Sequence, residues 1–250
     1  MSIVNSFDPD LESIIKPEHL AKPIEGFPET VVITFTRYML NTFLQHYTCV
    51  TIDTMSDGRM VYETTYKNQP LAFYRASIGA ASTVRLLEES IIKGARKFLL
   101  FGSCGILDNS IADGDIVVPT HAYRDEGTSY HYVPADAGDF IEVKTAGRMS
   151  DILKEIDAEH TMGKTWTTDA IFRETRGNMQ KRKELGCVVV EMECAGVMAM
   201  AQFRRIDAYQ YLYTADNLDA KEWERRSLGG LSRNTKERYA QMALESAIRL

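Results

Sequence analysis

Stretches with the pattern of β-strands alternate with stretches that have the pattern of α-helices, from Val31 to the end of the 250-residue chain. This alternation limits the fold more than any other feature, because such an order of elements builds a sheet covered by helices. No linker rich in proline, glycine and serine interrupts it. The sequence therefore predicts the α/β class, as a single three-layer α/β/α domain over residues 1–250 with a mixed, largely parallel central sheet.

Short runs of β-branched and other apolar residues mark the buried strands. We expect strands at 31–35, 59–68, 71–79, 97–101, 112–120, 160–168 and 207–217, with a turn at 68–70. The stretch 187–203 begins as a strand and becomes a helix, and further helices are expected at 82–95, at 150–159 with Ser150 as N-cap, and from about 232 to 250. An arginine-rich loop should follow residue 168. Residues 1–30, polar and with four prolines, predict an N-terminal arm with at most one short helical piece.

Charge and cysteine usage exclude several classes of function. The net charge is -6, so no large cationic surface for nucleic acid or for a membrane is expected. The start of the chain does not resemble a signal peptide, and no stretch approaches the roughly 20 apolar residues that cross a bilayer. The four cysteines are scattered without the spacing of a zinc site, so we expect reduced thiols, a cytoplasmic protein and no bound metal.

Polar segments fall at the carboxyl ends of four predicted strands. They occupy residues 77–79, 102–105, 191–193 and 214–216. Ligands of open α/β sheets bind beyond the carboxyl ends of the strands. We therefore expect these four segments to converge on one site.

Two of these segments have the composition of an anion site. In FGSCG (101–105), two glycines flank a hydroxyl, so the backbone can approach a ligand and its N–H groups can hold an anion. An ordinary Gly-Ser turn is the alternative. In SIGAAST (77–83), a strand end leads into a helix whose N-terminus suits phosphate, although Ser82 could serve only as an N-cap.

The other two segments supply carboxylates. Glu191 and Glu193 follow three valines and, in an extended segment, would share a face that accepts hydrogen bonds from sugar hydroxyls. A solvated helix start, where acidic side chains favour the helix dipole, is the alternative. Asp216 ends a strand and would be a general acid if its pKa were raised, or else a turn or N-cap residue.

Taken together, the motifs resemble the nucleoside phosphorylase family, which includes purine nucleoside phosphorylase, uridine phosphorylase and related nucleosidases. The resemblance covers roughly Val31 to the final helix and rests on SIGAAST, FGSCG, GDIVVPTHAYRDEGTSYHYVP, TTDAIFRETR and VVVEMECAG. RDEGTSYHY and TTDAIFRETR look especially like members described as uridine phosphorylase-like. The resemblance implies a pentosyltransferase that cleaves a (deoxy)ribonucleoside with inorganic phosphate, needs no cofactor, and forms a homo-oligomer with active sites shared between subunits.

The resemblance also implies roles for individual residues. Glu193 would hold the ribose hydroxyls, and Asp216 would protonate the leaving base, as in purine-cleaving members. The remaining ribose ligands would be Met192, Glu191 and His19, the last reaching a neighbouring subunit unless it is an ordinary surface histidine. The phosphate ligands would be Gly79, Gly102 and Ser103, and the base would lie against Thr168, Phe172, Arg173 and Arg176.

The chain departs from the family where phosphate is clamped. The sequence Gly-Asp-Pro-x-Arg is absent after the first strand, where TFTRYML stands instead, and Leu100 occupies the position of a second arginine. Arg37 and Arg59 are candidate replacements. The alternatives are a nucleosidase that uses water, or a catalytically silent nucleoside-binding homologue. The base also stays open between uracil and a purine, since the loop after Phe172 carries arginines but no glutamine.

Overall fold

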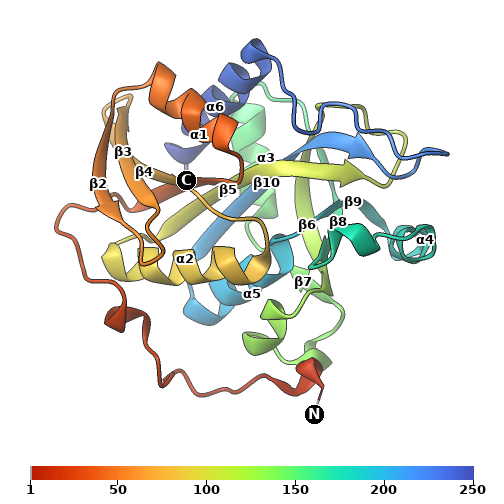
Figure 1. Ribbon diagram of the computed structural model, residues 1–250, viewed down its shortest axis with the longest axis horizontal. Coiled ribbons are helices and arrows are strands. Elements are labelled where there is room, and N and C mark those ends of the chain that lie inside the picture. Colours follow the sequence, from red (N-terminus) through yellow and green to blue (C-terminus); the bar gives the residue numbers. More distant parts are fainter. Residues whose placement is uncertain (1) are drawn as a thin grey trace.

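The buried apolar runs form one twisted sheet in the computed structural model, which describes residues 2–250 (Figure 1). The strands of this sheet are β1 (Thr30–Thr34), β2 (Cys49–Thr54), β3 (Met60–Tyr66), β4 (Gln69–Arg75), β5 (Lys97–Ile106), β6 (Ile116–Asp125), β7 (Phe140–Glu142), β8 (Thr161–Thr168), β9 (Cys187–Glu191) and β10 (Asp207–Asn217). The α-helices are α1 (Arg37–His46), α2 (Ala80–Lys93), α3 (Ala146–Glu155), α4 (Arg176–Glu184), α5 (Cys194–Arg204) and α6 (Arg233–Ala247).

The strand order is β10-β6-β8-β9-β5-β1-β4-β3-β2, with β7 beside β6. Strand β10 also pairs with β5, so β5, β9, β8, β6 and β10 close into a ring. The long pairings of β5 with β1 and with β10 are parallel, whereas the hairpins β2–β3 and β3–β4 are antiparallel. The predicted mixed, largely parallel sheet is confirmed.

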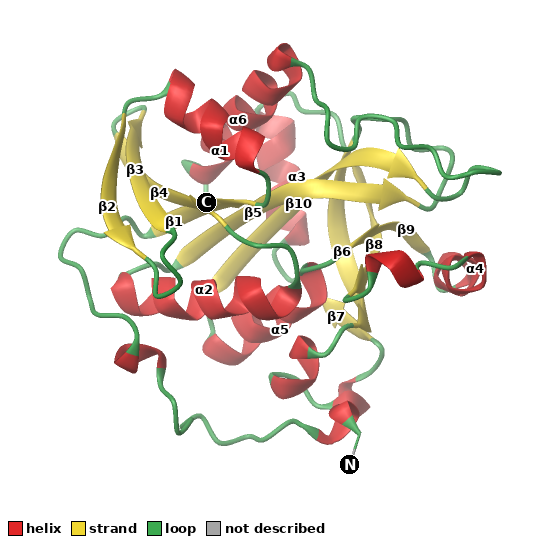
Figure 2. Cartoon of the chain, viewed as in Figure 1, coloured by secondary structure: helices red, strands yellow, loops and turns green. Residues whose placement is uncertain are grey.

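Helices cover both faces of the sheet (Figure 2). Helices α1, α3 and α6 lie on one face, and α2 and α5 lie on the other. Aromatic rings fill the layer below α6: Tyr239 stacks on Tyr213 at 4.6 Å between ring centroids, and Phe101 stacks on Tyr211 at 5.5 Å. This large core holds the strand ends in fixed relative positions.

Several boundaries differ from the predictions. The FGSCG motif lies inside β5 rather than after a strand, because the pairing of β5 with β10 continues to Ile106. The hairpin turn is at Lys67 and Asn68, which both have positive φ, so β4 already begins at Gln69. Polar residues that can adopt the left-handed conformation set this turn, and the proline after it fits the strand.

The predicted N-cap at Ser150 was wrong. The N-cap of helix α3 is Thr145, five residues earlier, and Ser150 lies inside the helix, where its hydroxyl is 2.7 Å from Nε2 of His160. The prediction of an arginine-rich loop missed α4, which is polar on nearly all sides and so lacks an apolar stripe.

Helix α1 and the strands β2 and β7 were also missed, and the N-terminal arm contains two 3-10 turns, at Ile3–Asn5 and Pro17–His19, rather than one helical piece. Strand β2 is exposed or half-buried along its length, so it lacks the apolar run that marks the central strands. The arm runs along the lower side of the molecule in Figure 1, below α2 and α5.

Close packing of α5 on α2 depends on a glycine. A Cβ atom at Gly196 in α5 would lie 2.7 Å from Cβ of Ala80 in α2 and 3.2 Å from Cβ of Thr128. The first distance is too short for two carbon atoms and the second is tighter than most such contacts, and the neighbours are short side chains that cannot swing away. A residue larger than glycine would therefore push α5 away from α2.

We predict that Gly196→Ala destabilises the fold by about 1–3 kcal/mol, the usual cost of overpacking a core. The matched control is Gly177→Ala in α4, where no atom lies within 4 Å of the added Cβ. There alanine should be neutral or stabilising by up to about 1 kcal/mol, because it is the better helix former. Urea unfolding of both variants measures the difference, and equal stabilities would contradict the packing argument.

Candidate active site

The polar strand ends meet at a cavity of about 140 Å³. Its walls come from the carboxyl ends of β5, β9 and β10, the starts of α1 and α5, and the loop after β8. The lining residues are Phe35, Thr36, Ile78, Ser103, Cys104, Gly105, Ile171, Glu174, Val190, Glu191, Met192, Glu193, Asp216 and Leu228. All four predicted segments contribute, so their predicted convergence is confirmed. Larger hollows, of about 530, 650, 280 and 340 Å³, lie elsewhere and contain none of these segments' residues.

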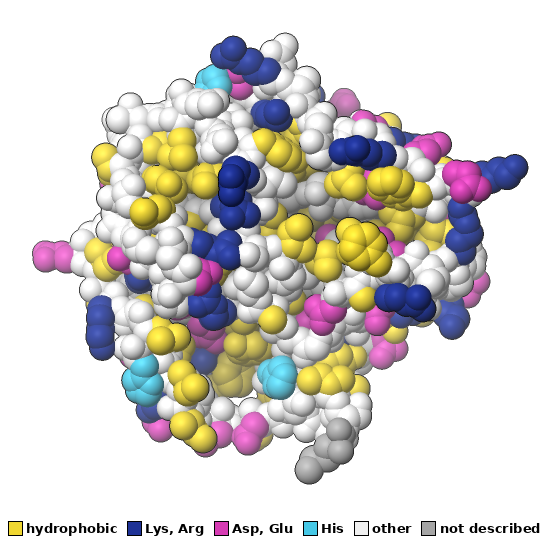
Figure 3. Space-filling model, in the orientation of Figure 1, with side chains coloured by type: hydrophobic (Ala, Val, Ile, Leu, Met, Phe, Trp, Pro, Cys, Tyr) yellow, Lys and Arg dark blue, Asp and Glu magenta, His cyan; other side chains and the backbone are white. Residues whose placement is uncertain are grey.

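The face around the strand ends mixes apolar and acidic side chains. Figure 3 shows hydrophobic side chains gathered beside the carboxyl ends of β5 and β10, with acidic side chains among and below them. Exposed apolar residues near the cavity include Ile78, Ile171 and Trp223. A hollow with apolar walls and a few fixed polar groups is the usual form of a small-molecule site.

Glu193 is held at the junction of β9 and α5. It is the N-cap of α5, and its Oε1 accepts a hydrogen bond of 2.6 Å from the backbone N–H of Gly79. Gly79 has φ of 105°, a conformation that favours glycine, and this geometry turns its N–H toward the carboxyl group. Within residues 2–250 the Oε2 atom has no hydrogen-bond partner, so it is free to receive a ligand hydroxyl.

Glu191 has a different role from the one predicted for it. Its Oε2 accepts hydrogen bonds from the backbone N–H groups of Glu193 and Cys194, at 2.8 and 2.7 Å, and its Oε1 accepts one of 2.5 Å from the hydroxyl of Thr167. Both oxygens are therefore occupied within the chain. The sequence left two alternatives for Glu191, a ligand of sugar hydroxyls or an acidic residue at a solvated helix start. Its contacts are those of an acidic residue at a helix start, but the side chain is buried rather than solvated.

The two carboxyl groups differ in charge state. Burial and the nearby Glu191 carboxylate raise the pKa of Glu193 to about 8. Burial also raises the pKa of Glu191, but hydrogen bonds from Thr167 and from two backbone N–H groups oppose that rise. A side-chain hydroxyl and two backbone N–H groups stabilise the anion of Glu191, whereas only the backbone of Gly79 and Met192 does so for Glu193, so the pair holds its proton at Glu193 rather than at Glu191.

Asp216 faces the same cavity from β10. The register of β10 against β5 shifts between Thr214 and Asp216, and this irregularity sets Asp216 opposite Gly105. Its Oδ2 accepts a hydrogen bond of 2.8 Å from the indole N–H of Trp223, and its Oδ1 lies near Gly105. Burial raises the pKa of Asp216, as a general acid requires.

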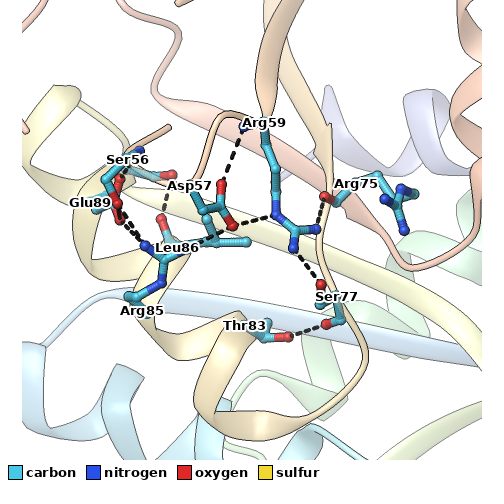
Figure 4. Close-up of polar contacts among 10 residues, drawn as sticks. Ser56, Asp57, Arg59, Arg75, Ser77, Thr83, Arg85, Leu86 and Glu89 are labelled. Atoms are coloured by element: carbon cyan, nitrogen blue, oxygen red, sulfur yellow. Dashed lines mark hydrogen bonds and ion pairs between the residues drawn. The ribbon is translucent and has the colours of Figure 1, made fainter. Parts of the chain in front are cut away.

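A cluster of arginines lies near the phosphate residues that the motifs implied. Arg59 donates to the hydroxyl of Ser77, to the carbonyl of Arg75 at 3.0 Å and to Asp57 at 2.6 Å (Figure 4). Its donors are thus engaged within the chain rather than in the cavity. Ser103 lines the cavity. Gly102 does not, but it packs against the cavity residue Phe35, since a Cβ at Gly102 would come 2.8 Å from the Phe35 ring.

Arg75 is a residue that the sequence reasoning missed. Burial and the charges of Arg59 and Arg37 lower the pKa of Arg75, so the three guanidinium groups lie near one another. Within residues 2–250, neither Arg75 nor Arg37 forms an ion pair, and the Arg75 guanidinium in Figure 4 makes no drawn contact. The available signal was its position, inside the predicted strand 71–79 and two residues before the SIG segment.

The residues predicted to bind the base are less well placed. The side chain of Phe172 is 96% exposed, and Arg173 is also exposed. Arg176 donates to the carbonyl groups of Ala220 and Lys221, which ties α4 to the loop after β10. Thr168 is buried, and its hydroxyl accepts a hydrogen bond from Ala170. None of the four lines the cavity, whereas Glu174 does.

Glu174 was missed because two arginines flank it in a stretch that looked solvated. His19 lies in the turn Pro17–His19, near Lys16, and does not line the cavity of its own chain. In the described part of the chain, no three His, Cys, Asp or Glu residues are grouped so as to hold a metal ion. Between residues 2 and 250, no helix is both long and apolar enough to span a membrane.

Comparison with known families gives one match over most of the chain. Residues 29–249 match the model of the phosphorylase superfamily. Among solved structures, purine nucleoside phosphorylase from Toxoplasma gondii in complex with immucillin-H is similar in fold, with a TM-score of 0.74 and 18% sequence identity. That similarity covers 96% of this chain and 98% of the other.

Curated relatives are similar at lower coverage. The guanosine phosphorylase of Halorubrum lacusprofundi is 26% identical over 59% of this chain and 61% of its own length. The uridine phosphorylase of Escherichia coli is 26% identical over 53% of this chain and 58% of its own length, so these two alignments span about three fifths of each relative. A DeoD-type purine nucleoside phosphorylase of Exiguobacterium sibiricum is 23% identical over 86% and 89%.

The buried Glu193 carboxyl group should make stability depend on pH. Its pKa in the folded chain, about 8, lies above the ordinary 4.5, so the unfolded chain loses this proton first and stability falls as the pH rises from about 4.5 to about 8. We predict that Glu193→Gln, which keeps an acceptor for Gly79, melts a few degrees above the wild type near pH 9. Each kcal/mol of added stability should raise the melting temperature by about 2–4 °C.

The difference should shrink toward pH 5, because both states of the wild type are then largely protonated. Melting curves at the two pH values test this, with the exposed Glu25→Gln as a control that should show no such trend. If the difference in melting temperature between Glu193→Gln and the wild type were the same at both pH values, the prediction would be wrong, because stability would then not depend on the proton of Glu193.

Proposed function

The chain belongs to the phosphorylase superfamily, and we propose that it is a nucleoside phosphorylase, which cleaves a (deoxy)ribonucleoside with inorganic phosphate into free base and pentose 1-phosphate. The predicted family is confirmed by the match over residues 29–249. The names of the relatives, which are guanosine, uridine and purine nucleoside phosphorylases, support the reaction class.

One observation carries the proposal. A single cavity joins a buried carboxyl group with one free oxygen, a second carboxyl group with a raised pKa, and a serine set between two glycines. These are the groups that a glycosidic bond to nitrogen requires: an acceptor for the ribose hydroxyls, a proton donor for the departing base, and a place for an anion. No residue of the cavity has to serve two of these purposes.

The reaction follows from the positions of these groups. Breaking the bond leaves positive charge on the sugar and negative charge on the base. Oε2 of Glu193 accepts a hydrogen bond from a ribose hydroxyl and fixes the sugar above Met192. Asp216, with Oδ2 held by Trp223, carries its proton on Oδ1 and gives it to the base as the bond lengthens. A phosphate oxygen near Ser103 then attacks C1 of the sugar.

The three arginines supply the charge for phosphate. Arg37 and Arg75 have no acidic partner among residues 2–250, and only Asp57 offsets Arg59. Guanidinium groups held close together repel one another, so an anion that binds between them relieves this repulsion. Arg75 therefore binds phosphate in place of the arginine that the family has at the position of Leu100. In this chain Leu100 is fully buried in the core.

A hydrolase that uses water is the second candidate, because no Lys, Arg or His among residues 2–250 lines the cavity itself. We predict that base release requires phosphate and that Arg75→Ala raises the KM for phosphate about 10- to 100-fold, the value of a hydrogen bond to a charged group. The KM for nucleoside should change by less than about threefold. Arg233→Ala, an exposed arginine of α6, is the matched control.

Measurement of base and sugar products with and without phosphate decides between the candidates. Pentose 1-phosphate should accumulate with phosphate and little base should appear without it. Equal rates in both buffers, with free ribose as the product, would establish the hydrolase. Binding of nucleoside without turnover in either buffer would mark a silent homologue.

The proposal includes a cytoplasmic homo-oligomer with shared sites. His19 lies outside the cavity of its own chain, as a residue that serves a neighbour's site would. We predict that inactive His19→Ala and Glu193→Ala variants regain activity when mixed, because some sites then receive both native residues. Sedimentation that shows a fully active monomer would rule this arrangement out.

A further inference from the structure

The loop that follows β10 is held from outside by helix α4. Arg176, the first residue of α4, donates a hydrogen bond of 2.9 Å to the carbonyl oxygen of Ala220 and another to that of Lys221. Lys183, two turns further along the same face of α4, forms an ion pair with Asp219. Two side chains of α4 therefore fix three consecutive residues at the tip of this loop.

The base of the loop is closed on the end of β10. Asn217 and Glu224 exchange two backbone hydrogen bonds, of 2.9 and 3.1 Å. The Asn217 side chain is buried, and its amide donates a hydrogen bond of 2.8 Å to Oδ1 of Asn109. Residues 218–223 are thus enclosed between this closed base and the contacts with α4, so the position of α4 determines where these residues lie.

Trp223 connects the loop to the chemistry of the cavity. Its indole N–H donates a hydrogen bond of 2.8 Å to Oδ2 of Asp216, and within residues 2–250 no other group donates a hydrogen bond to this carboxyl group. The indole has one N–H in a fixed direction, so the position of its ring decides which oxygen of Asp216 has a partner. The ring itself is 56% exposed. Because the core does not hold the ring, the loop must place it.

The charges around Asp216 determine how tightly it holds its proton. Burial raises the pKa of Asp216, whereas the hydrogen bond from Trp223 and the charge of Arg226 lower it. Arg226 is itself paired with Glu224. The other titratable groups that face Asp216 across the cavity or from neighbouring loops are Cys104, Asp113, Glu174, Glu191 and Glu193.

We propose that Arg176 and Trp223 are positioning residues for the proton donor: Arg176 fixes the loop 218–223, and this loop places the indole N–H that orients the Asp216 carboxyl group. This inference rests on the proposed function and deepens it. As the bond from C1 to the base breaks, its electron pair stays on the base nitrogen. The base takes the proton from Oδ1 of Asp216, and the carboxylate that remains keeps the indole N–H as a partner at Oδ2.

The test follows kcat/KM against pH for the nucleoside that is cleaved fastest among guanosine, inosine, adenosine and uridine. Trp223→Phe should lower kcat about 10-fold and change the KM for nucleoside by less than about threefold. The basic limb of its pH profile should move to higher pH, because the Asp216 carboxylate loses a donor and its pKa rises. A role of Trp223 in packing alone would leave this limb in place.

Arg176→Met should move the same limb in the same direction by a smaller amount. Arg176→Lys keeps the charge but lacks the fork that reaches two carbonyl groups, so its limb should lie between those of Arg176→Met and the wild type. The matched control is Lys181→Met, which removes a charge from an exposed position of α4 that makes no contact with the loop. Its pH profile should match that of the wild type.

A double-mutant cycle decides whether Arg176 acts through Trp223. If it does, Trp223→Phe combined with Arg176→Met should be no slower than Trp223→Phe alone, because the indole N–H has already been removed. Additive losses would overturn the inference. So would a rise in the KM for nucleoside in Arg176→Met with an unmoved basic limb, since that result would make Arg176 a ligand of the nucleoside.

If no nucleoside is cleaved, the proposed function fails instead, and the indole fluorescence of the intact protein tests the positioning. The emission should change with pH as Asp216 titrates, and this change should be absent from both Trp223→Phe and Asp216→Asn. Arg176→Met should move its midpoint to higher pH or abolish it. An identical titration in the wild type and in Arg176→Met would refute the inference.

Discussion

The buried carboxylate of Glu191 at the start of α5 is the interaction on which the site depends. It accepts hydrogen bonds from two backbone N–H groups of the helix start and from Thr167 on β8. These bonds satisfy helix donors that would otherwise be buried without partners, and they join β8, β9 and α5 at one point. Because that turn is fixed, Glu193 is aimed at Gly79 and its second oxygen at the cavity. Loss of Glu191 would release the whole strand-to-helix junction.

Four carboxyl groups share one small cavity, and their environments separate their roles. Glu191 is anchored as an anion by a side-chain hydroxyl and two backbone N–H groups, whereas Glu193 has backbone donors alone and a pKa raised to about 8. Asp216 is oriented by Trp223, and Glu174 has no partner within residues 2–250. A set of like charges in a confined space cannot all ionise, and burial raises the pKa values of Glu174, Glu193 and Asp216. The cavity therefore contains both a hydrogen-bond acceptor for the sugar, Glu193, and an acid for the base, Asp216.

The positive groups lie outside the cavity proper. The three arginines near β4 carry the charge that a phosphate would meet, and Arg59 is already fixed between Asp57 and Ser77. Ser77 precedes Ile78 and Gly79, so the arginine cluster is connected through the backbone to the donor that holds Glu193. The anion side and the ribose side of the site are thus linked through three consecutive residues between β4 and α2.

The sequence by itself determined the α/β class, the central strands and the family, because long apolar runs and the order of the motifs are local properties. It also predicted that four polar segments would converge, since parallel strands bring their carboxyl ends to one edge. It missed α4 and β2, whose residues are largely polar or exposed and so have little apolar pattern, and also α1, although Met39 and Phe43 form a buried face there. Only the tertiary structure decided that Glu191 is anchored by several donors while Glu193 faces the cavity. It also decided that Arg176 turns away from the cavity, that Glu174 lines it and that Arg75 lies near Arg59 and Arg37. Those outcomes depend on which partners lie within about 3 Å of each charged group, and residues far apart in the chain provide these partners.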